Sequence, residues 1–269
     1  MQYDVIIIGG GHAGVEAASA SARRGARTLL MTQSITDLGA MSCNPSIGGP
    51  GKSQMVAEMD AMGGVMPVAA DAAGIHFRTL NASHGAATQA LRAQIDRGMY
   101  HNAVIKILGE LPNLTIACET VKKLNIATKT INDAYQARAI VLTTGTFLQG
   151  VITRGDERIA SGRLQDDGTY QCPDTHISAA LRDAGFSLMR LKTGTPARIF
   201  RDSINFDICE LQPGDTPHDW FSAPNADNNY DAVCYITHTT HSTHDIIRDN
   251  IKNAPMYNGA IVGTGPRYC

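Results

Sequence analysis

The feature that most constrains this fold is a glycine-rich turn near the N-terminus, between an apolar run and an alanine-rich segment. Residues 4–8 (DVIII) are β-branched after the first, as in a strand buried on both faces of a parallel sheet. The turn 9–14 (GGGHAG) follows, and residues 15–24 are predicted to be helical. Gly25 can end that helix, and residues 28–32 (TLLMT) form a second apolar run. This order predicts a strand–helix–strand unit.

Each glycine of the turn has its own task in dinucleotide binding. Gly9 permits the tight turn, Gly11 lets the backbone approach a pyrophosphate, and Gly14 allows close packing of helix and strand. The start of the helix adds unpaired N–H groups and the positive end of its dipole. Because a strand precedes the turn and a helix follows it, we predict dinucleotide binding rather than a merely structural turn. The predicted contacts are Gly9, Gly10, Gly11, His12, Ala13 and Gly14.

The identity of the dinucleotide is harder to read. An acidic residue normally ends the second strand and binds the ribose, but Thr32 and Gln33 stand there, and the next carboxylate is Asp37. The N-terminal position of the unit favours FAD, as does a later strand that ends in residues 144–146 (TGT). That second motif is read equally well as a plain turn at a strand end.

Composition bounds the class of protein. The chain has 269 residues, 43% of them hydrophobic and 18% charged, with 26 glycines, which is typical of an α/β protein with many tight turns. The net charge of −2 does not indicate nucleic-acid binding, so such a site must be a local patch. Six scattered cysteines without CxxC spacing predict reduced thiols and a cytoplasmic protein. We expect no signal peptide, no membrane-spanning segment and no metal site.

The rest of the chain is expected to alternate helices, strands and loops. We expect an FAD-binding part over residues 1–200, followed by the start of a nicotinamide or substrate subdomain over 201–269. The abrupt end after Gly-Pro-Arg-Tyr-Cys predicts a truncated chain. The expected elements are an irregular region (38–64), a helix (86–108), a strand pair (114–117 and 121–126), a strand (137–143), a polar loop (151–168) and a helix (177–184) that Gly185 ends.

Two other motifs are weaker than they look. Residues 48–53 (GGPGKS) lack the first glycine of a phosphate loop, because Ser46 stands at its position, and no buried strand is predicted before them. His238, His241 and His244 have regular spacing, but no cysteine or acidic cluster lies near them, so polar packing is preferred to zinc.

Cys43 lies in a glycine-rich loop after the second strand, where ligands bind; spacing alone favours a buried, inert thiol there over a nucleophile.

Several segments resemble signatures of the MnmG/GidA family, from one end of the chain to the other. They are residues 9–18 (GGGHAGVEAA), 41–45 (MSCNP), 145–148 (GTFL), 191–196 (LKTGTP), 234–239 (CYITHT) and 265–269 (GPRYC). The family also lacks the acidic residue after the second strand. The resemblance implies a Rossmann-like FAD-binding domain, similar to that of glutathione reductase, with an inserted α/β subdomain.

The resemblance also implies an activity. Members of the family use FAD, NADH and methylene-tetrahydrofolate, together with the GTPase MnmE, as a homodimer. They place a carboxymethylaminomethyl or aminomethyl group on carbon 5 of the wobble uridine of tRNA. A thiolate that adds to carbon 6 of uracil turns carbon 5 into a nucleophile. Cys43 and Cys269 match the family's thiols, and which of them attacks is left open.

Other roles follow from the same resemblance. Val121 is expected beside the adenine half of FAD, and Gly265, Pro266 and Arg267 are expected to begin the nicotinamide-binding stretch. The GTPase is expected to dock on a C-terminal helical region that the family has beyond residue 269. Basic residues also fall in matching segments, as candidates for phosphate or tRNA contact, although solvated surface is the default reading for each: Lys52, Arg92, Arg97, Lys192 and Arg267.

Two departures and two alternatives accompany this interpretation. The family's Ser-Gly-Gly-Arg stretch appears as Ala160-Ser161-Gly162-Arg163, and the flavin contact that the resemblance implies there is assigned to Ser161. His84, Ala86 and Gln89 replace the family's usual Lys, Pro and Arg, which removes two positive charges. A folate-dependent tRNA methyltransferase of the TrmFO type is one alternative, although the segments 41–45 and 265–269 argue against it. A non-catalytic FAD-binding module is the other.

Overall fold

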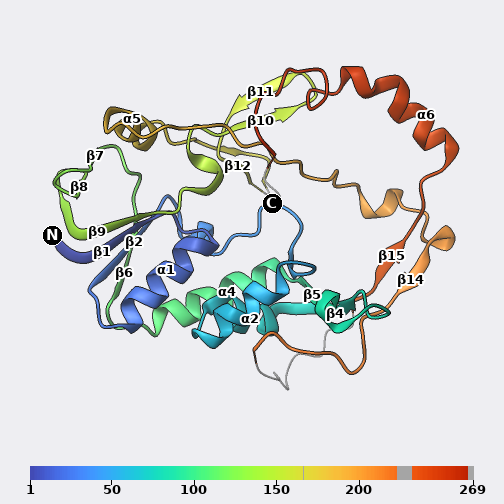
Figure 1. Ribbon diagram of the computed structural model, residues 1–269, viewed down its shortest axis with the longest axis horizontal. Helices are drawn as coiled ribbons and strands as arrows, with labels where there is room; N and C mark the ends of the chain where they lie inside the picture. The colour runs from blue at the N-terminus through green and yellow to red at the C-terminus, as the bar shows by residue number, and fades with distance from the viewer. Residues whose placement is uncertain (166, 223–231, 266–269) are drawn as a thin grey trace. The chain divides into compact units, whose positions relative to one another are not determined.

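The computed structural model describes residues 1–165, 167–222 and 232–265 (Figure 1). The chain groups into two compact units. Unit 1 is Met1–Gly145 with Gln212–Cys234, and unit 2 is Thr146–Leu211 with Tyr235–Cys269. These boundaries do not coincide with the expected division at residue 200. The assignment of cofactor and substrate functions to parts of the chain stays a prediction.

Unit 1 begins with the predicted strand–helix–strand unit. Strand β1 (Gln2–Ile8), helix α1 (His12–Arg23) and strand β2 (Thr28–Thr32) confirm it. Gly25, with φ of +86°, follows the helix end in the left-handed conformation that glycine adopts readily. β1 and β2 run parallel, with Ile6 opposite Leu29. Ile6, Ile7, Leu29 and Leu30 have no exposed surface, which is the burial that their apolar runs predicted.

The main sheet of unit 1 has the order β6-β2-β1-β9-β8-β7. Its strands β6 (Leu114–Cys118), β2, β1 and β9 (Tyr135–Leu142) are parallel neighbours, while β8 (Thr130–Ile131) and β7 (Leu124–Asn125) add an antiparallel edge. This is a Rossmann-like α/β arrangement. Helix α1 lies on one face of the sheet together with α4 (Figure 1). The expected strand 121–126 is wrong in extent, because only β7 within it pairs.

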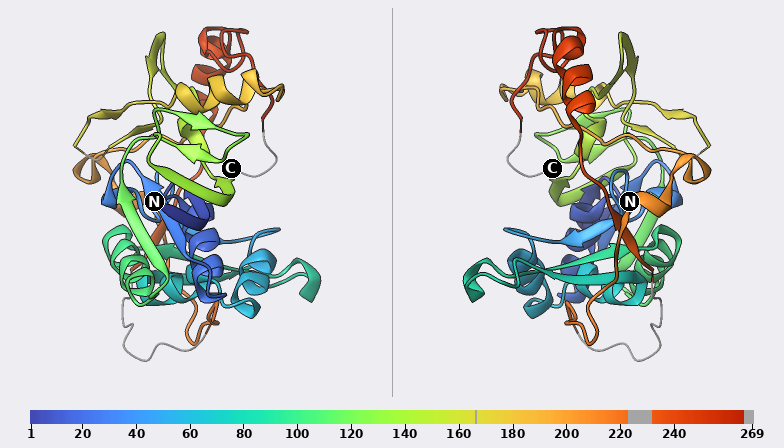
Figure 2. Two further views of the ribbon diagram at one scale, coloured as in Figure 1. Left: turned by 90° about the vertical axis from the view of Figure 1, so that its left-hand side faces the viewer. Right: turned by 90° about the vertical axis from the view of Figure 1, so that its right-hand side faces the viewer.

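A second sheet lies between β2 and β6 in the sequence, where loop and helix were expected. It has the order β3-β5-β4, and Figure 2 shows the β4–β5 hairpin projecting with a 3₁₀ turn at its tip. Its elements and the helices beside them are η1 (Ile35–Asp37), β3 (Ser46–Gly48), α2 (Ser53–Ala61), α3 (Val65–Ala73), β4 (Gly74–Leu80), η2 (Ala86–Thr88), β5 (Ala90–Ile95) and α4 (Arg97–Gly109).

Two predictions are therefore wrong in this region. The irregular region 38–64 contains β3 and α2; α2 buries only Val56 fully, so its apolar period is weak. The helix expected over 86–108 is a strand in its first half, because pairing of β5 with β3 and β4 overrides the helix preference of alanine, leucine and glutamine. Asp96 separates the halves: its carboxylate caps α4 by accepting a hydrogen bond from the backbone N–H of Met99 at 2.8 Å.

Unit 2 consists of short elements. The expected loop 151–168 contains the hairpin β10–β11 instead, and α5 ends before Gly185 as predicted. The chain crosses between the units at β14 and β15, which pair in a two-stranded sheet. The elements are η3 (Gly145–Phe147), β10 (Val151–Arg154), β11 (Glu157–Ala160), β12 (Arg163–Leu164), β13 (Tyr170–Gln171), α5 (His176–Asp183), η4 (Arg201–Ser203), η5 (Phe206–Ile208), β14 (Glu210–Gln212), β15 (Cys234–Ile236), α6 (His241–Asn250) and η6 (Ile251–Asn253).

Candidate dinucleotide-binding site at the carboxyl edge of the parallel sheet

The glycine turn joins the carboxyl end of β1 to the start of α1. Gly9 has φ of +113°, and a side chain there would collide with the carbonyl oxygen of Thr143. A side chain at Gly14 would collide with the carbonyl oxygen of Gly9 and lie 2.8 Å from Oγ1 of Thr143. Both positions therefore require glycine for packing alone. β1 lies between β2 and β9 here, where the strand order reverses, which is where α/β sheets bind ligands.

Gly11 differs from its neighbours. A Cβ built on Gly11 meets no atom of the described chain within 4 Å. Gly11 is the N-cap of α1, which has no side-chain capping bond and no acidic residue in its first turn, all of whose residues are described. The first N–H groups of α1 and the positive end of its dipole are thus left for an anion. The turn leaves open space at Gly11, and the approach of a pyrophosphate there stays a prediction.

Thr143 is a site residue that sequence reasoning missed. Its hydroxyl group lies 3.0 Å from the carbonyl oxygens of Ile8 and Gly9, to which it donates a shared hydrogen bond. It therefore fastens the end of β9 to the turn. A threonine directly after an apolar strand was the available signal, but its partners lie more than 130 residues away in sequence.

His12 and Glu16 of the motif serve α1 in different ways. Burial lowers the pKa of His12, so its imidazole is neutral at pH 7, and its ring lies 5.6 Å from that of Tyr100. The pKa of Tyr100 is raised by burial and by the charge of Glu16. The Glu16 carboxylate accepts hydrogen bonds from the N–H groups of Val65 (3.0 Å) and Met66 (2.7 Å) at the start of α3. Glu16 thus joins α1 to α3, a structural role.

The end of β2 carries no acidic ribose ligand, and Asp37 does not substitute for it. The Asp37 side chain is buried and accepts a hydrogen bond from the N–H of Ser34 at 3.0 Å, within the capping box of η1. The hydroxyl group of Thr32 donates to the carbonyl oxygen of Ser34 at 3.2 Å. The side chains at this strand end therefore hold the loop that follows β2.

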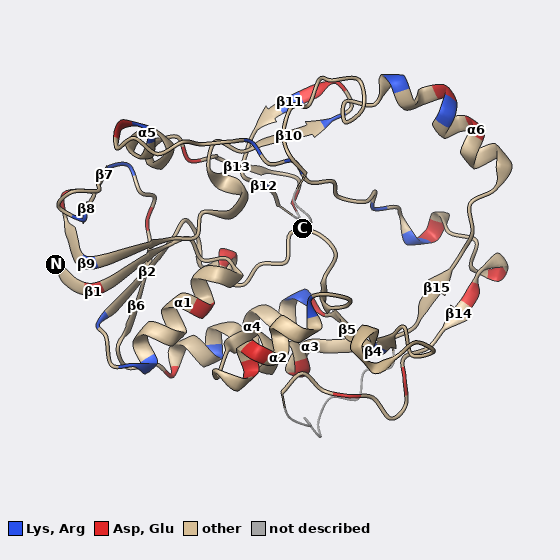
Figure 3. Ribbon diagram, in the orientation of Figure 1, with Lys and Arg blue, Asp and Glu red and all other residues tan. Residues whose placement is uncertain are grey.

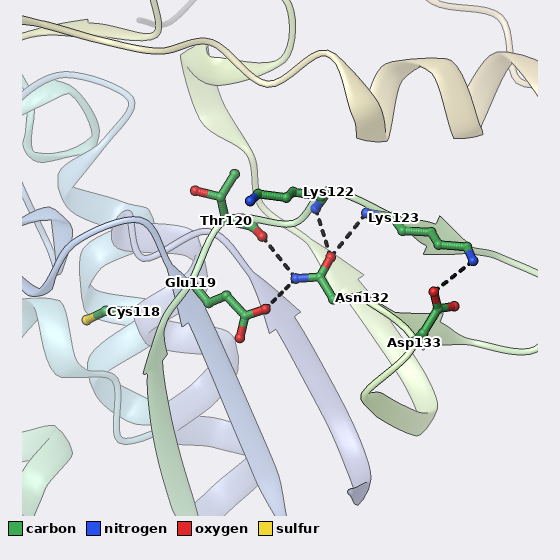
Figure 4. Close-up of a pocket in the computed structure, with 7 residues that line it drawn as sticks. All are labelled: Cys118, Glu119, Thr120, Lys122, Lys123, Asn132 and Asp133. Carbon is green, nitrogen blue, oxygen red and sulfur yellow. Dashed lines mark hydrogen bonds and ion pairs between the residues drawn. The ribbon is translucent and has the colours of Figure 1, made fainter.

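A polar hollow lies at the carboxyl end of β6, shown in Figure 4. Asn132 organises it: its Oδ1 accepts from the N–H groups of Lys122 (2.8 Å) and Lys123 (3.1 Å). Its Nδ2 donates to Glu119 Oε1 (2.6 Å) and to the carbonyl oxygen of Thr120 (3.0 Å). Val121 lies in this segment, with its side chain buried, so a ligand there would meet its backbone. The hollow is lined by Cys118, Glu119, Thr120, Lys122, Lys123, Asn132 and Asp133.

Cys43 belongs to unit 1 and is half-buried. Arg97 Nη2 donates to the carbonyl oxygen of Cys43 at 2.9 Å, and the N–H of Ile95 donates to that of Pro45 at 2.7 Å. Earlier in this loop, the N–H of Gly39 donates to the carbonyl oxygen of Gly10 at 2.9 Å. The segment that carries the thiol is therefore fastened to the glycine turn at one end and to β5 and α4 at the other.

The remaining predicted residues lie in unit 2 or outside the description. Ser161 is buried; its hydroxyl group donates to the carbonyl oxygens of Gln171 (2.8 Å) and Arg163 (3.0 Å), so it holds the β12–β13 hairpin. Gly265 is exposed. The roles predicted for Ser161 and Gly265 stay predictions. Pro266, Arg267 and Cys269 lie outside the described residues.

Metal and membrane features were searched over the described residues. His241 and His244 lie on α6, not on a strand, and His244 Nε2 is hydrogen-bonded to Thr239 Oγ1 at 2.8 Å. Across the described ranges, no group of three or more His, Cys, Asp or Glu side chains could hold a metal ion. None of the helices in those ranges combines the length and apolar character needed to cross a membrane.

Comparison with known proteins covers nearly the whole chain. The family model described as "Glucose inhibited division protein A" matches residues 4–269. A crystal structure of Aquifex aeolicus GidA, form I, is 41% identical with a TM-score of 0.88, over 100% of this chain and 46% of that one. The form II crystal is 40% identical with a TM-score of 0.84, over 94% of this chain and 44% of that one. The chain thus spans less than half the length of these relatives.

Proposed function

Because this chain belongs to the GidA family, we propose that it binds FAD at the glycine turn and forms part of an enzyme that modifies the wobble uridine of tRNA. The observation that carries the proposal is the open side of Gly11 beside the uncapped start of α1. A pyrophosphate can approach the backbone there without displacing a side chain. The product would carry a carboxymethylaminomethyl or aminomethyl group on carbon 5.

The residues would divide the work as follows. The backbone N–H groups at the start of α1 would hold the FAD pyrophosphate. The 119–123 segment, shaped by Asn132, receives the adenine half near Val121. Gly265, Pro266 and Arg267 would begin the stretch that meets NADH. When bound, FAD supplies hydride and one-carbon chemistry that no side chain provides.

The thiol prepares the base. A thiolate of Cys43 or Cys269 forms a bond to carbon 6 of uracil, and the electron pair of the 5,6 double bond moves toward carbon 5 and the 4-oxygen. Carbon 5 then bonds to the methylene carbon of methylene-tetrahydrofolate. The bonds from that carbon to the folate nitrogens break, tetrahydrofolate leaves, and an amine (ammonia or glycine) takes its place on the carbon. Loss of the carbon 5 proton and departure of the thiolate restore the double bond. In unit 1, Arg97 holds the Cys43 carbonyl and so positions that loop.

The partners complete the proposal. We infer a cytoplasmic enzyme that works as a homodimer with the GTPase MnmE, which docks on a region that corresponds to the part of the relatives beyond this match. NADH would reduce the flavin.

The first test is a visible absorption spectrum of the purified chain before and after FAD is added. A flavin band at about 450 nm that survives gel filtration supports cofactor binding. Bleaching by NADH, and a mass increase of the wobble uridine in undermodified tRNA on addition of MnmE and methylene-tetrahydrofolate, support the reaction. A flavin-loaded chain that NADH does not bleach contradicts the proposed use of NADH and favours a non-catalytic module.

A further inference from the structure

The β3–β5–β4 sheet has one face in the apolar core of unit 1 and one face on which polar residues predominate, beside Leu80 and Ala90. Ile47, Phe77, Ala93 and Ile95 belong to the buried core of unit 1. Side chains alternate between faces along a strand, and residues directly opposite each other share a face. The other face therefore carries two cross-strand rows of three residues each. The first row is Gly48, Arg92 and Arg78, and the second is Ser46, Gln94 and His76.

The first row places two positive charges directly opposite each other. Arg92 of β5 pairs in register with Arg78 of β4, and both side chains are half-buried. Like charges in this position destabilise a sheet. Throughout the described ranges, no carboxylate forms an ion pair with either guanidinium group. Asp215, which is near β4, instead accepts a hydrogen bond from the backbone N–H of Thr79 at 2.6 Å.

Most hydrogen-bond donors of the two guanidinium groups have no acceptor in the described chain. Arg92 Nη2 donates to Ser46 Oγ at 3.3 Å, and Arg78 Nη1 donates to the carbonyl oxygen of Pro213 at 3.4 Å. A guanidinium group has five N–H donors in a planar fork that matches the oxygens of a phosphate. Gln94 adds an uncharged amide in the next row. An anion between the two arginines would relieve their repulsion.

The same elements hold the loop of Cys43. Arg92 contacts Ser46, three residues after Cys43, and Arg97 contacts the Cys43 carbonyl oxygen. An anion on Arg92 is therefore bound next to the segment that carries the thiol. The glycine turn belongs to the parallel sheet, whereas this pair belongs to a separate one. The arginine pair is thus a second anion site beside the dinucleotide phosphate site.

We propose that Arg78 and Arg92 bind a backbone phosphate of the RNA, at or beside the nucleotide whose base reaches Cys43. This inference rests on the proposed function. The chemistry recognised is a phosphate group, and an RNA phosphodiester supplies it where the base is the substrate. The pair positions the substrate and takes no part in the bond-making step.

The test is the salt dependence of RNA binding. A fluorescent stem–loop RNA with an unpaired uridine is titrated with the full chain, supplemented with FAD, across a salt series. The Arg78→Gln/Arg92→Gln variant is expected to flatten the slope of log K against log salt by about 0.7, the value for one lost phosphate contact. Arg78→Lys/Arg92→Lys keeps both charges and is expected to keep the slope. The matched control is Arg138→Gln, at a side chain 87% exposed on β9 that lies 3.6 Å from Asp4.

Three outcomes overturn the inference, and they are distinguishable. If the glutamine variant folds by circular dichroism and keeps the wild-type slope, the arginine site is wrong and the proposed function stands. If the variant loses affinity for ADP or methylene-tetrahydrofolate while RNA binding is unchanged, the site holds a nucleotide or a carboxylate instead. If the wild-type chain retains FAD but binds no RNA, the proposed function and the inference both fail.

Discussion

Leu29 and Leu30 in unit 1 are fully buried, whereas Phe200 in unit 2 is 87% exposed and Val262 is 81% exposed. Of the buried apolar side chains in the described ranges, Ile177 is the single member from unit 2. Basic and acidic residues are interspersed within each unit (Figure 3), so charge does not separate them. The difference is one of core packing. Unit 1 has the packing that holds a binding turn in one geometry, and the candidate site lies there.

The largest expected change in the free energy of unfolding comes from a substitution in the core of unit 1. Leu30→Ala removes a fully buried side chain and should lower the free energy of unfolding by about 2–5 kcal/mol. Phe200→Ala removes an exposed ring and should change it by less than about 0.5 kcal/mol. Urea unfolding of both variants checks the contrast. Equal losses would mean that unit 2 buries Phe200 in solution.

A smaller effect is expected at the turn itself. Gly14→Ala places a methyl group against the carbonyl oxygen of Gly9 and should cost about 1–3 kcal/mol of stability. Gly194→Ala in unit 2, where a Cβ meets no atom of the described chain within 4 Å, is the matched control and should stay within about 0.5 kcal/mol. The two urea midpoints are compared. A Gly14→Ala midpoint at the wild-type value contradicts the close packing of helix and strand.

The next prediction concerns the pH response of unit 1. Burial lowers the pKa of His12 below its unfolded value of 6.5, so the unfolded chain binds more protons at this site. Its contribution to stability is full above pH 6.5, falls as the pH drops below that value, and levels off below the folded pKa. Hydrogen exchange of α1 at pH 7.5 and pH 5.5 should show weaker protection at the lower pH. His12→Gln should remove the part of this loss of protection that comes from protonation of His12. A His12→Gln variant with the wild-type pH response contradicts the prediction.

The smallest expected effect is at Asp174 in unit 2, where stability changes with pH in the direction opposite to that at His12. Burial raises the pKa of Asp174, whose Oδ1 has no hydrogen-bond partner in the described chain. The folded state therefore binds more protons here, and stability is lost as the pH rises from 3.8 through the folded pKa. In the native chain, the N–H of Ile177 donates to Asp174 Oδ2 at 3.0 Å. Asp174→Asn keeps an oxygen that can accept this hydrogen bond but removes the buried charge, so it should slightly stabilise α5 at pH 7. Weaker hydrogen-exchange protection of α5 in this variant at pH 7 would contradict the predicted stabilisation.

The sequence predicted best what is local and fully buried. The run 4–8, the turn and the run 28–32 carry their signal within adjacent residues, because strands buried on both faces are apolar throughout. Strand β5 lacks such a signal, since it is a strand only through pairing with β3 and β4. The first half of strand β4 alternates apolar and polar residues (Ile75, His76, Phe77, Arg78), a pattern that was present in the sequence and overlooked.

In the candidate site, too, residues with a local sequence signal were predicted and those that depend on distant contacts were not. Gly9, Gly11 and Gly14 were predicted from spacing, and the structure gives each a distinct surrounding. Thr143 was missed because its role depends on β9 lying beside β1. Arg92 was among the candidate phosphate contacts, but its pairing with Arg78 was missed because the two side chains are neighbours only in the register of β4 and β5. Contacts made by distant strands do not appear in a local pattern.

The most direct test of the account is the affinity of the chain for FAD when Gly11 is changed to alanine. The new methyl group meets no described atom of the protein, so stability should not change, while the approach of a pyrophosphate is blocked. The matched control is Gly109→Ala, where a Cβ also has open space. The account predicts that Gly11→Ala weakens FAD binding at least about tenfold, roughly 1.4 kcal/mol, while Gly109→Ala keeps the wild-type affinity. A folded Gly11→Ala variant that binds FAD as tightly as the control would contradict the account.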